Sequence, residues 1–291
     1  MPELPEVETI KRDLNKRVVG KTIVGVWSDA PKLIKRPKNF LQFKKGIIGK
    51  KIEKVQRRAK NVLFYLSGGK IMLAHQKMTG HFLYGNWEKK ENLWKSKVKG
   101  PLDDPMNRFV HLIFYLDNKK QLALSDMRKF AKIELWKEKD LLNNKEFNKI
   151  GPEPLDRSFS LKKFKKIISE EKGKIKQVLM DQTVIAGIGN IYSDEVLWRA
   201  KINPLRKIAD LSEEDLGNIY FAIIDVLKKS IKLRGESFSD FRDLQGEKGK
   251  FDVERKVYKR EKELCERCKT PIKRMKVGGR SAHFCPKCQK V

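Results

Sequence analysis

Four cysteines near the C-terminus constrain the fold of this chain more than any other feature. They form two Cys-x-x-Cys pairs, Cys265 with Cys268 and Cys285 with Cys288, and sixteen residues separate the pairs. Two pairs at this distance can supply four thiolates to a tetrahedral zinc ion. A disulfide framework would usually spread its cysteines and would need an oxidising compartment. The spacing therefore predicts one structural Zn²⁺, because four sulfurs leave no open position for a substrate, and His283 is not needed as a ligand.

The charge balance favours a polyanionic partner. The 291 residues include 66 Lys and Arg against 37 Asp and Glu, a formal net charge of +29. A positive surface of this size attracts DNA or RNA, because binding to phosphates releases counterions. A lysine-rich proteome would explain part of the excess. The cysteine module itself is basic between its two pairs, which favours DNA over a protein partner for it.

No part of the sequence predicts a membrane segment. The densest apolar runs, 62–66 and 112–116, have the length of strands and are too short to span a bilayer. The first residues are acidic and no apolar run follows them, so they do not resemble a signal peptide. The expected location is the cytoplasm.

Hydrophobic periodicity predicts an α+β protein. Residues 5–19 have apolar positions at helical spacing, and short strand-like runs then continue to about residue 136. Helical patterns follow at 161–169, 174–182, 190–200 and 211–233. The expected domains are a strand-rich domain at 1–136, folded as an antiparallel sandwich or barrel, a linker at 137–155, a helical domain at 156–260 and a cysteine module at 261–291. The Lys-rich stretch 86–107 and the Gly-rich stretch 235–250 are expected to be loops.

Pro2 is a candidate nucleophile. A small second residue normally allows Met1 to be removed, and Pro2 would then carry a secondary amine. An α-amino group has a pKa near 8, so roughly a tenth of it is neutral at pH 7, against about a few ten-thousandths of an ordinary lysine. A neutral amine can attack a sugar C1′ and form an iminium that permits β-elimination. Glu3 could transfer protons and Glu6 could order the site, although both acids also suit the N-terminus of a helix.

Several short motifs, in order along the whole chain, resemble those of the bacterial formamidopyrimidine-DNA glycosylases. They are Pro2-Glu3-Leu4-Pro5-Glu6-Val7-Glu8-Thr9, Gln56-Arg57-Arg58-Ala59-Lys60, Gly151-Pro152-Glu153-Pro154-Leu155, Leu179-Met180-Asp181, Gly187-Ile188-Gly189-Asn190-Ile191-Tyr192 and the cysteine module. The resemblance implies a two-layer β-sandwich preceded by a helix, then a helix-two-turn-helix domain and a zinc finger. It also implies a monomer that binds double-stranded DNA containing oxidised purines and flips the damaged nucleotide out of the stack.

The resemblance assigns roles to individual residues. Catalysis would involve Pro2 as the nucleophile, Glu3 in proton transfer, Glu6 as a supporting carboxylate and Lys60 beside the lesion. Met78, Arg128 and Phe130 match the wedge that fills the vacated stack. Four further DNA contacts are expected: Asn190 and Arg280 at phosphates, Lys176 near the same phosphates, and Tyr258.

The sequence departs from the family pattern near the wedge. The usual Leu-Gly before the wedge methionine is Gln76-Lys77, and a usual proline and glycine are replaced by Met127 and Ala131. Lys259 stands where the family usually has glycine. These changes leave the chemistry in place, but they bear on the geometry that sets the opposite-base preference.

Two other functions fit parts of the pattern. A sister glycosylase for oxidised pyrimidines uses the same proline chemistry, but it usually begins Pro-Glu-Gly-Pro, and here Leu4 stands at the third mature position. A non-catalytic DNA-binding protein could share the scaffold. The presence of Pro2, Glu3 and Lys60 argues against this second alternative.

Overall fold

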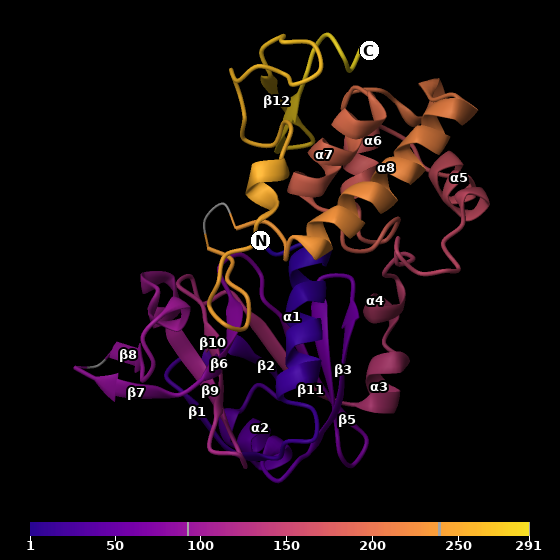
Figure 1. Ribbon diagram of the computed structural model, residues 1–291. Coiled ribbons are helices and arrows are strands. Elements are labelled where there is room, and N and C mark those ends of the chain that lie inside the picture. The colour runs from indigo at the N-terminus through magenta and orange to yellow at the C-terminus, as the bar shows by residue number, and fades with distance from the viewer. Residues whose placement is uncertain (92, 238–239, 291) are drawn as a thin grey trace. The chain divides into compact units, whose positions relative to one another are not determined.

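The chain forms two compact units (Figure 1). The computed structural model describes residues 1–91, 93–237 and 240–290. One unit comprises residues 1–148 and 233–250, and the other comprises 149–232 and 251–291. The stretch 233–250 therefore packs with the N-terminal residues, whereas its place in the sequence had put it in the helical domain. Side-chain contacts with the first helix, described below, account for this.

Two sheets form the body of the N-terminal unit. The four-stranded sheet has the order β1 (Ile23–Ser28), β9 (Val110–Leu116), β10 (Gln121–Ser125), β6 (His81–Gly85). The five-stranded sheet has the order β2 (Ile34–Arg36), β11 (Lys132–Lys137), β5 (Lys70–His75), β4 (Asn61–Leu66), β3 (Ile52–Arg58). Neighbouring strands are antiparallel except for β2 and β11. The predicted β-sandwich is confirmed.

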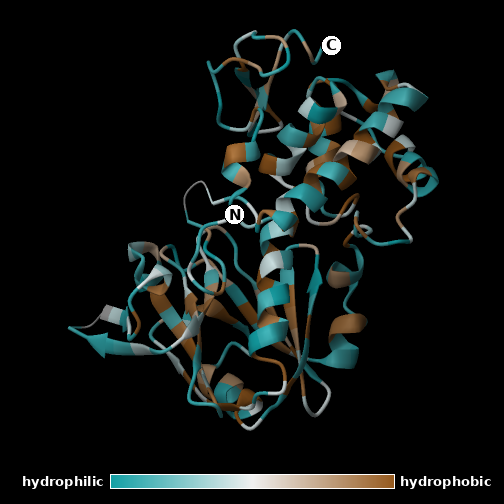
Figure 2. Cartoon of the chain, in the orientation of Figure 1, coloured by the Kyte–Doolittle hydropathy of each residue, from teal (hydrophilic) through white to brown (hydrophobic). Residues whose placement is uncertain are grey.

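The core of the sandwich lies between the sheets. Phe64 of β4 and Phe82 of β6 are fully buried, and their ring centroids are 5.6 Å apart in an edge-to-face arrangement. Aromatic pairs at this distance add to the free energy gained by burial. Figure 2 shows apolar residues concentrated on these strands, while the β7 arrow is hydrophilic. Helix α1 (Leu4–Arg17) joins the same core through Val7, Ile10 and Leu14.

The ends of α1 follow from its sequence. Pro5 lies in the first turn, where its missing N–H costs nothing. The carboxylate of Glu6 accepts a hydrogen bond from the backbone N–H of Glu3 at 2.7 Å, which satisfies a donor at the helix start. Lys16 and Arg17 lie in the last turn and complement the helix dipole.

Two segments contain more regular structure than their sequences predicted. The expected loop 86–107 contains a hairpin of β7 (Trp87–Lys90) and β8 (Leu93–Ser96), and Trp87 packs in a small apolar cluster on the outer face of β6, β9 and β10. The expected linker 137–155 begins with α3 (Glu138–Leu142) and α4 (Lys145–Asn148), because Leu141 and Phe147 pack on β4 and β5.

Helix α2 (Phe40–Ile47) was not expected, and Asn39 caps it. Three 3-10 turns complete the unit: Pro31–Leu33, Pro101–Asp103 and Pro105–Arg108.

The C-terminal unit is helical and ends in a hairpin. Its elements are α5 (Leu161–Ser169), α6 (Ile175–Met180), α7 (Asn190–Ala200), α8 (Glu213–Lys232), β12 (Lys273–Val277), β13 (Arg280–Phe284) and 3-10 turns at Ile208–Asp210 and Phe251–Glu254. All four helical patterns of the sequence are present as helices. Among the described residues, no helix combines the length and the apolar character that crossing a membrane requires.

Candidate functional site

The N-terminal segment places Pro2 and two carboxylates together at the start of α1. Pro2, Glu3 and Glu6 are buried, whereas Met1 is 50% exposed. One oxygen of Glu6 accepts the Glu3 N–H, and the other accepts the backbone N–H of Glu236 at 2.7 Å. Glu6 is thus held from both sides by backbone donors. The exposed Met1 is accessible to an aminopeptidase, while the residue that would carry the new amine is enclosed.

Lys60 lies in the two-residue turn between β3 and β4. Its neighbour Ala59 has a φ of +51°, a conformation that costs energy for any residue with a side chain. The carbonyl of Ala59 accepts a hydrogen bond from the Arg57 guanidinium at 3.0 Å, and the Nε of Arg57 donates to Glu8 at 3.1 Å. The turn that carries Lys60 is therefore tied to α1.

Glu8 was given no site role from the sequence. Burial opposes its ionisation, but Arg12, Lys11 and Arg57 outweigh that effect and lower the pKa of Glu8. The carboxylate stays charged and connects α1 to the Lys60 turn. The pairing with Arg57 spans 49 positions, so no local pattern could reveal it.

The three expected wedge residues lie together and are exposed. The Arg128 guanidinium donates to the Met78 sulfur at 3.2 Å and lies 4.5 Å from the centre of the Phe130 ring. Met78 and Phe130 are both large apolar side chains about half exposed. An exposed apolar pair beside an arginine is unusual on a soluble surface and is typical of a contact site.

A buried aspartate connects the two loops of this wedge. Asp126 accepts hydrogen bonds from the Ala131 N–H at 2.7 Å and from the Thr79 hydroxyl, and that hydroxyl accepts the Arg128 N–H at 3.1 Å. Asp126 is fully buried. This role of Asp126 was not predicted, although Asp126 lies only two positions before Arg128.

The segment before the wedge contains two unusual side chains. Burial, together with the positive charges of the nearby Lys77, Lys60 and Lys132, lowers the pKa of His75 to about 3. The neutral ring accepts the Lys77 N–H at 3.0 Å. Gln76 is 2% exposed, and neither atom of its amide has a hydrogen-bond partner within the described residues. A buried amide in this state is energetically costly.

In the C-terminal unit, Asn190 begins α7 directly after a glycine turn. Gly187 has a φ of +88°, and the Gln182 side chain bonds both the Gly187 N–H at 2.9 Å and the Ile188 carbonyl at 2.7 Å. Gly189 is the N-cap of α7, and Asn190 is the first residue of the helix. The Asn190 Oδ1 is buried and has no hydrogen-bond partner among the described residues.

Lys176 has a different environment from the one expected. It is 0% exposed, and its ammonium donates to Asp194 at 2.5 Å and to Ser193 at 3.1 Å. The second oxygen of Asp194 accepts the His283 N–H at 2.9 Å and lies 3.0 Å from its ring nitrogen. Lys176 thus ties α6 to α7, and Asp194 ties α7 to β13. Lys176 presents no exposed surface to a phosphate in this structure, and its expected phosphate contact stays a prediction.

Arg280 and Tyr258 lie on the surface of the same unit. Arg280 is exposed and begins β13 after the turn Gly278-Gly279, whose positive φ values of +55° and +75° suit a tight hairpin. The Tyr258 N–H donates to Glu195 at 2.8 Å, and its ring lies 5.3 Å from the His283 ring. Burial raises the pKa of Glu195 although three backbone N–H groups partly offset it. Glu195, for which no role was predicted, thereby holds the segment at Tyr258 that precedes the cysteine module.

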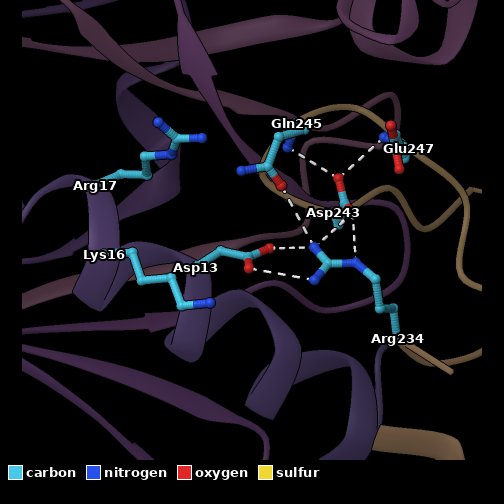
Figure 3. Close-up of a pocket in the computed structure, with 7 residues that line it drawn as sticks. All are labelled: Asp13, Lys16, Arg17, Arg234, Asp243, Gln245 and Glu247. Atoms are coloured by element: carbon cyan, nitrogen blue, oxygen red, sulfur yellow. Dashed lines mark hydrogen bonds and ion pairs between the residues drawn. The ribbon is translucent and has the colours of Figure 1, made fainter. Parts of the chain in front are cut away.

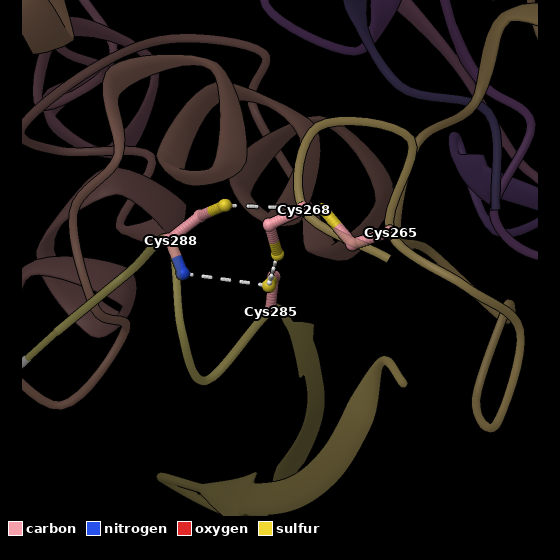
Figure 4. Close-up of side chains that lie close together, drawn as sticks. All are labelled: Cys265, Cys268, Cys285 and Cys288. Atoms are coloured by element: carbon pink, nitrogen blue, oxygen red, sulfur yellow. Dashed lines mark hydrogen bonds between the residues drawn. The ribbon is translucent and has the colours of Figure 1, made fainter. Parts of the chain in front are cut away.

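The four cysteines converge as their spacing predicted (Figure 4). The sulfurs of Cys268 and Cys285 are 3.3 Å apart, those of Cys265 and Cys288 are 4.0 Å apart, and all four lie within 4.8 Å of one another. A tetrahedral zinc with Zn–S bonds of about 2.3 Å needs sulfur separations of about 3.8 Å. The donor set therefore fits a zinc ion. His283 is engaged with Asp194 and is not part of the cluster.

Three family models match the chain in sequence. The N-terminal domain of formamidopyrimidine-DNA glycosylase matches residues 1–133, the H2TH domain of the same enzyme matches 150–242, and a zinc finger found in FPG and IleRS matches 262–291. Together they cover most of the chain.

Full-length relatives and solved structures agree with these matches. The chain is 41% identical to the formamidopyrimidine-DNA glycosylase of Pelotomaculum thermopropionicum and 38% identical to that of Desulforamulus reducens, over 100% of both chains in each case. It resembles the solved complex of Lactococcus lactis Fpg with DNA containing an abasic site, with a TM-score of 0.86 and 36% identity over 99% of this chain and 100% of that chain. It also resembles the complex of that Fpg with DNA containing FAPY-dG, with a TM-score of 0.85, 36% identity and the same coverage.

Proposed function

The chain belongs to the formamidopyrimidine-DNA glycosylase family, and we propose that it removes oxidised purines from double-stranded DNA and then cleaves the abasic strand. One observation carries the proposal. Pro2 is enclosed beside Glu3 and Glu6 at the start of α1, while Met1 is exposed and removable. The relatives solved with FAPY-dG and abasic DNA support the class of substrate.

The chemistry begins when removal of Met1 turns the Pro2 nitrogen into a secondary amine. Its lone pair attacks C1′ and forms a C–N bond, the bond from C1′ to the damaged base breaks, and the base leaves with a proton supplied by an acid in the site. Opening of the sugar ring gives an iminium between Pro2 and C1′. Loss of a C2′ proton then breaks the C3′–O bond and cleaves the strand. Glu3 is the nearest candidate for these proton transfers, because its backbone is fixed through Glu6.

The exposed wedge serves nucleotide flipping. Met78 and Phe130 can fill the gap that an extruded nucleotide leaves, and the Arg128 guanidinium can bond the orphaned base opposite. Lys60 is proposed to lie beside the lesion. In the other unit, Asn190, Arg280 and Tyr258 are the proposed DNA contacts, with Arg280 forming charge-assisted bonds to phosphate.

The cysteine module holds one structural zinc ion in this proposal. The four thiolates of the module would complete a tetrahedral shell and fix the hairpin that carries Arg280. We further propose a monomer, because one flipped nucleotide needs no second subunit, and we propose that it acts in the cytoplasm on chromosomal DNA.

Borohydride trapping tests the function directly. Duplexes containing 8-oxoguanine or an oxidised pyrimidine are incubated with the mature protein and borohydride, which reduces the iminium to a stable adduct. An adduct mainly with 8-oxoguanine supports the proposal, and preference for the pyrimidine would indicate the sister activity. Absence of any adduct, also with a preformed abasic site, would indicate a non-catalytic DNA-binding protein. Pro2→Gly should reduce trapping without changing the zinc content.

A further inference from the structure

Arg234 joins the stretch 233–250 to α1 through two buried carboxylates (Figure 3). Its Nη2 donates to Asp13 at 2.5 Å and to Asp243 at 2.6 Å, and its Nε donates to Asp243 at 2.9 Å. The side chains of Asp13 and Asp243 are 7% and 1% exposed. Hydrogen bonds between charged partners are stronger than neutral ones, and burial limits their screening by solvent.

The two residues after Arg234 run along the same helix toward the nucleophile. An ideal Cβ on Gly235 would lie 2.6 Å from the Glu6 carboxylate, so the backbone approaches Glu6 as closely as only glycine permits. The next N–H, that of Glu236, donates to Glu6. Asp13 and Glu6 are seven residues apart, about two helical turns, and therefore lie on one face of α1. The segment 234–236 is attached to that face at both ends.

These contacts form a continuous connection from Arg234 to the N-terminus. Arg234 fixes the segment on Asp13, the segment fixes the Glu236 N–H on one oxygen of Glu6, and the other oxygen holds the Glu3 N–H. The ends of the stretch are closed separately by the bond from the Lys250 N–H to the Leu233 carbonyl at 2.8 Å. The stretch can therefore stay folded without Arg234, which supplies its ion pair with α1 at Asp13, while the Glu236 N–H supplies a second contact at Glu6.

We propose that Arg234 is a positioning residue, which holds the Glu236 amide on Glu6 and thereby fixes the segment that carries Pro2. The inference rests on the proposed proline chemistry. Arg234 touches neither the reacting atoms nor DNA in this role. It acts on the orientation of the nucleophile, and so on the rate of bond formation and not on DNA affinity.

The main test compares three variants with the wild type. Arg234→Gln removes the charge and the bridge, Arg234→Lys keeps the charge but cannot span both carboxylates, and Asp13→Asn weakens the connection from the helix side. Arg17→Gln is the matched control, because Arg17 lines the same pocket and forms no ion pair within the described part of the chain. Single-turnover trapping at a preformed abasic site gives the rate and the amplitude at saturating duplex, and the dependence of the rate on duplex concentration gives the Kd.

A fall in rate of about tenfold is expected for Arg234→Gln and Asp13→Asn, with a smaller fall for Arg234→Lys, because a small misplacement of a nucleophile has a large effect on rate. The Kd should change less than about threefold, and Arg17→Gln should keep the wild-type rate. A merely structural role would lower the melting temperature and the amplitude, while the remaining active fraction would react at the wild-type rate. That result would overturn the proposal.

Hydrogen exchange separates this inference from the proposed function. Arg234→Gln should accelerate amide exchange in the peptide that contains Glu236 and in the one that contains Glu3, whether or not the protein reacts with DNA. Unchanged exchange in both peptides would refute the connection. Absence of trapping by the wild type would instead count against the proline chemistry.

Discussion

The wedge of the N-terminal unit and the hairpin of the C-terminal unit both hold exposed side chains in place, but different buried contacts support them. Each presents exposed residues that are proposed to contact DNA, and each is held by one buried aspartate. Asp126 bonds the loops of the wedge, and Asp194 bonds His283 in β13, the strand that begins with Arg280. Asp126 uses neutral donors only. Asp194 pairs with the buried ammonium of Lys176 and joins a module whose fold also depends on four thiolates. Two sets of similarly exposed residues can therefore be held by buried contacts that differ in strength and in their response to metal removal or to the loss of a charge.

Removal of zinc should give the largest difference in stability between the two regions. A chelator should unfold the hairpin that carries Arg280, since structural zinc contributes on the order of 10 kcal/mol to such modules. DNA affinity should fall about a hundredfold or more, because the phosphate contacts of the hairpin are lost. Fluorescence anisotropy and metal analysis would measure this. The β-sandwich should keep its melting transition, and a simultaneous loss of both units would contradict the comparison.

Lys176→Met should weaken the C-terminal unit next. Removing one partner of a buried ion pair typically costs about 3–5 kcal/mol, because the remaining charge is left without compensation. Denaturant unfolding followed by tryptophan fluorescence would measure the loss. If stability stayed constant while DNA affinity alone decreased, Lys176 would be a phosphate contact after all, as the family resemblance implied.

Asp126→Ala should damage the wedge without affecting the zinc module. The Ala131 N–H and the Thr79 hydroxyl would lose their acceptor, at a cost of about 2–3 kcal/mol. Excision of 8-oxoguanine should slow while zinc content remains unchanged. Met127→Ala, at the exposed neighbouring position, is the control and should be nearly neutral. Equal effects of the two substitutions would show that Asp126 does not organise the wedge.

Acid should selectively weaken the N-terminal unit through His75. Its pKa is about 3 in the folded protein, against about 6.5 when unfolded. Between these values the unfolded chain binds more protons, so this contribution is complete above pH 6.5 and is lost as the pH falls toward 3. Stability should decrease by about 1–2 kcal/mol from pH 7 to pH 5. His75→Asn should flatten that dependence in thermal melts, and an unchanged slope would exclude His75 as its source.

Gln76→Leu should give the smallest change in stability, and it should raise the stability of the protein. The buried amide of Gln76 has no hydrogen-bond partner within the described residues, so an apolar side chain of similar size should stabilise the sandwich by about 1 kcal/mol. Differential scanning calorimetry would detect the increase in melting temperature. A decrease would mean that the amide has a partner in solution, such as bound water.

Features encoded by neighbouring residues could be predicted from the sequence. The cysteine spacing gave the metal cluster, hydrophobic periodicity gave the principal strands and helices, and the first six residues gave the cluster at Pro2. The wedge residues were assigned only through the family resemblance. Without it, Met78 and Phe130 would be expected in the core, because methionine and phenylalanine are usually buried.

Pairings between distant residues could not be predicted in this way. Arg234 and Asp13 are 221 positions apart, and Glu195 bonds three amides more than 60 positions away. A buried ion pair has no periodicity, so charge counting on a chain with 66 basic residues cannot identify its members. The β7–β8 hairpin was missed for a related reason. Its polar strands depend on Trp87 packing against residues of other strands.

The return of residues 233–250 to the N-terminal unit also affects synthesis of the protein. The ribosome makes Glu6 and Asp13 near the beginning, but Arg234 and Glu236 become available only after the helices α5 to α8 have been translated. A nascent chain of 148 residues contains every strand of the two sheets but still lacks Arg234, the partner of Asp13, and the Glu236 amide, the second donor to Glu6. Since domains form as their residues emerge, the end of the sandwich around Pro2 is completed after its sheets, and a truncated product would carry Pro2 without this support.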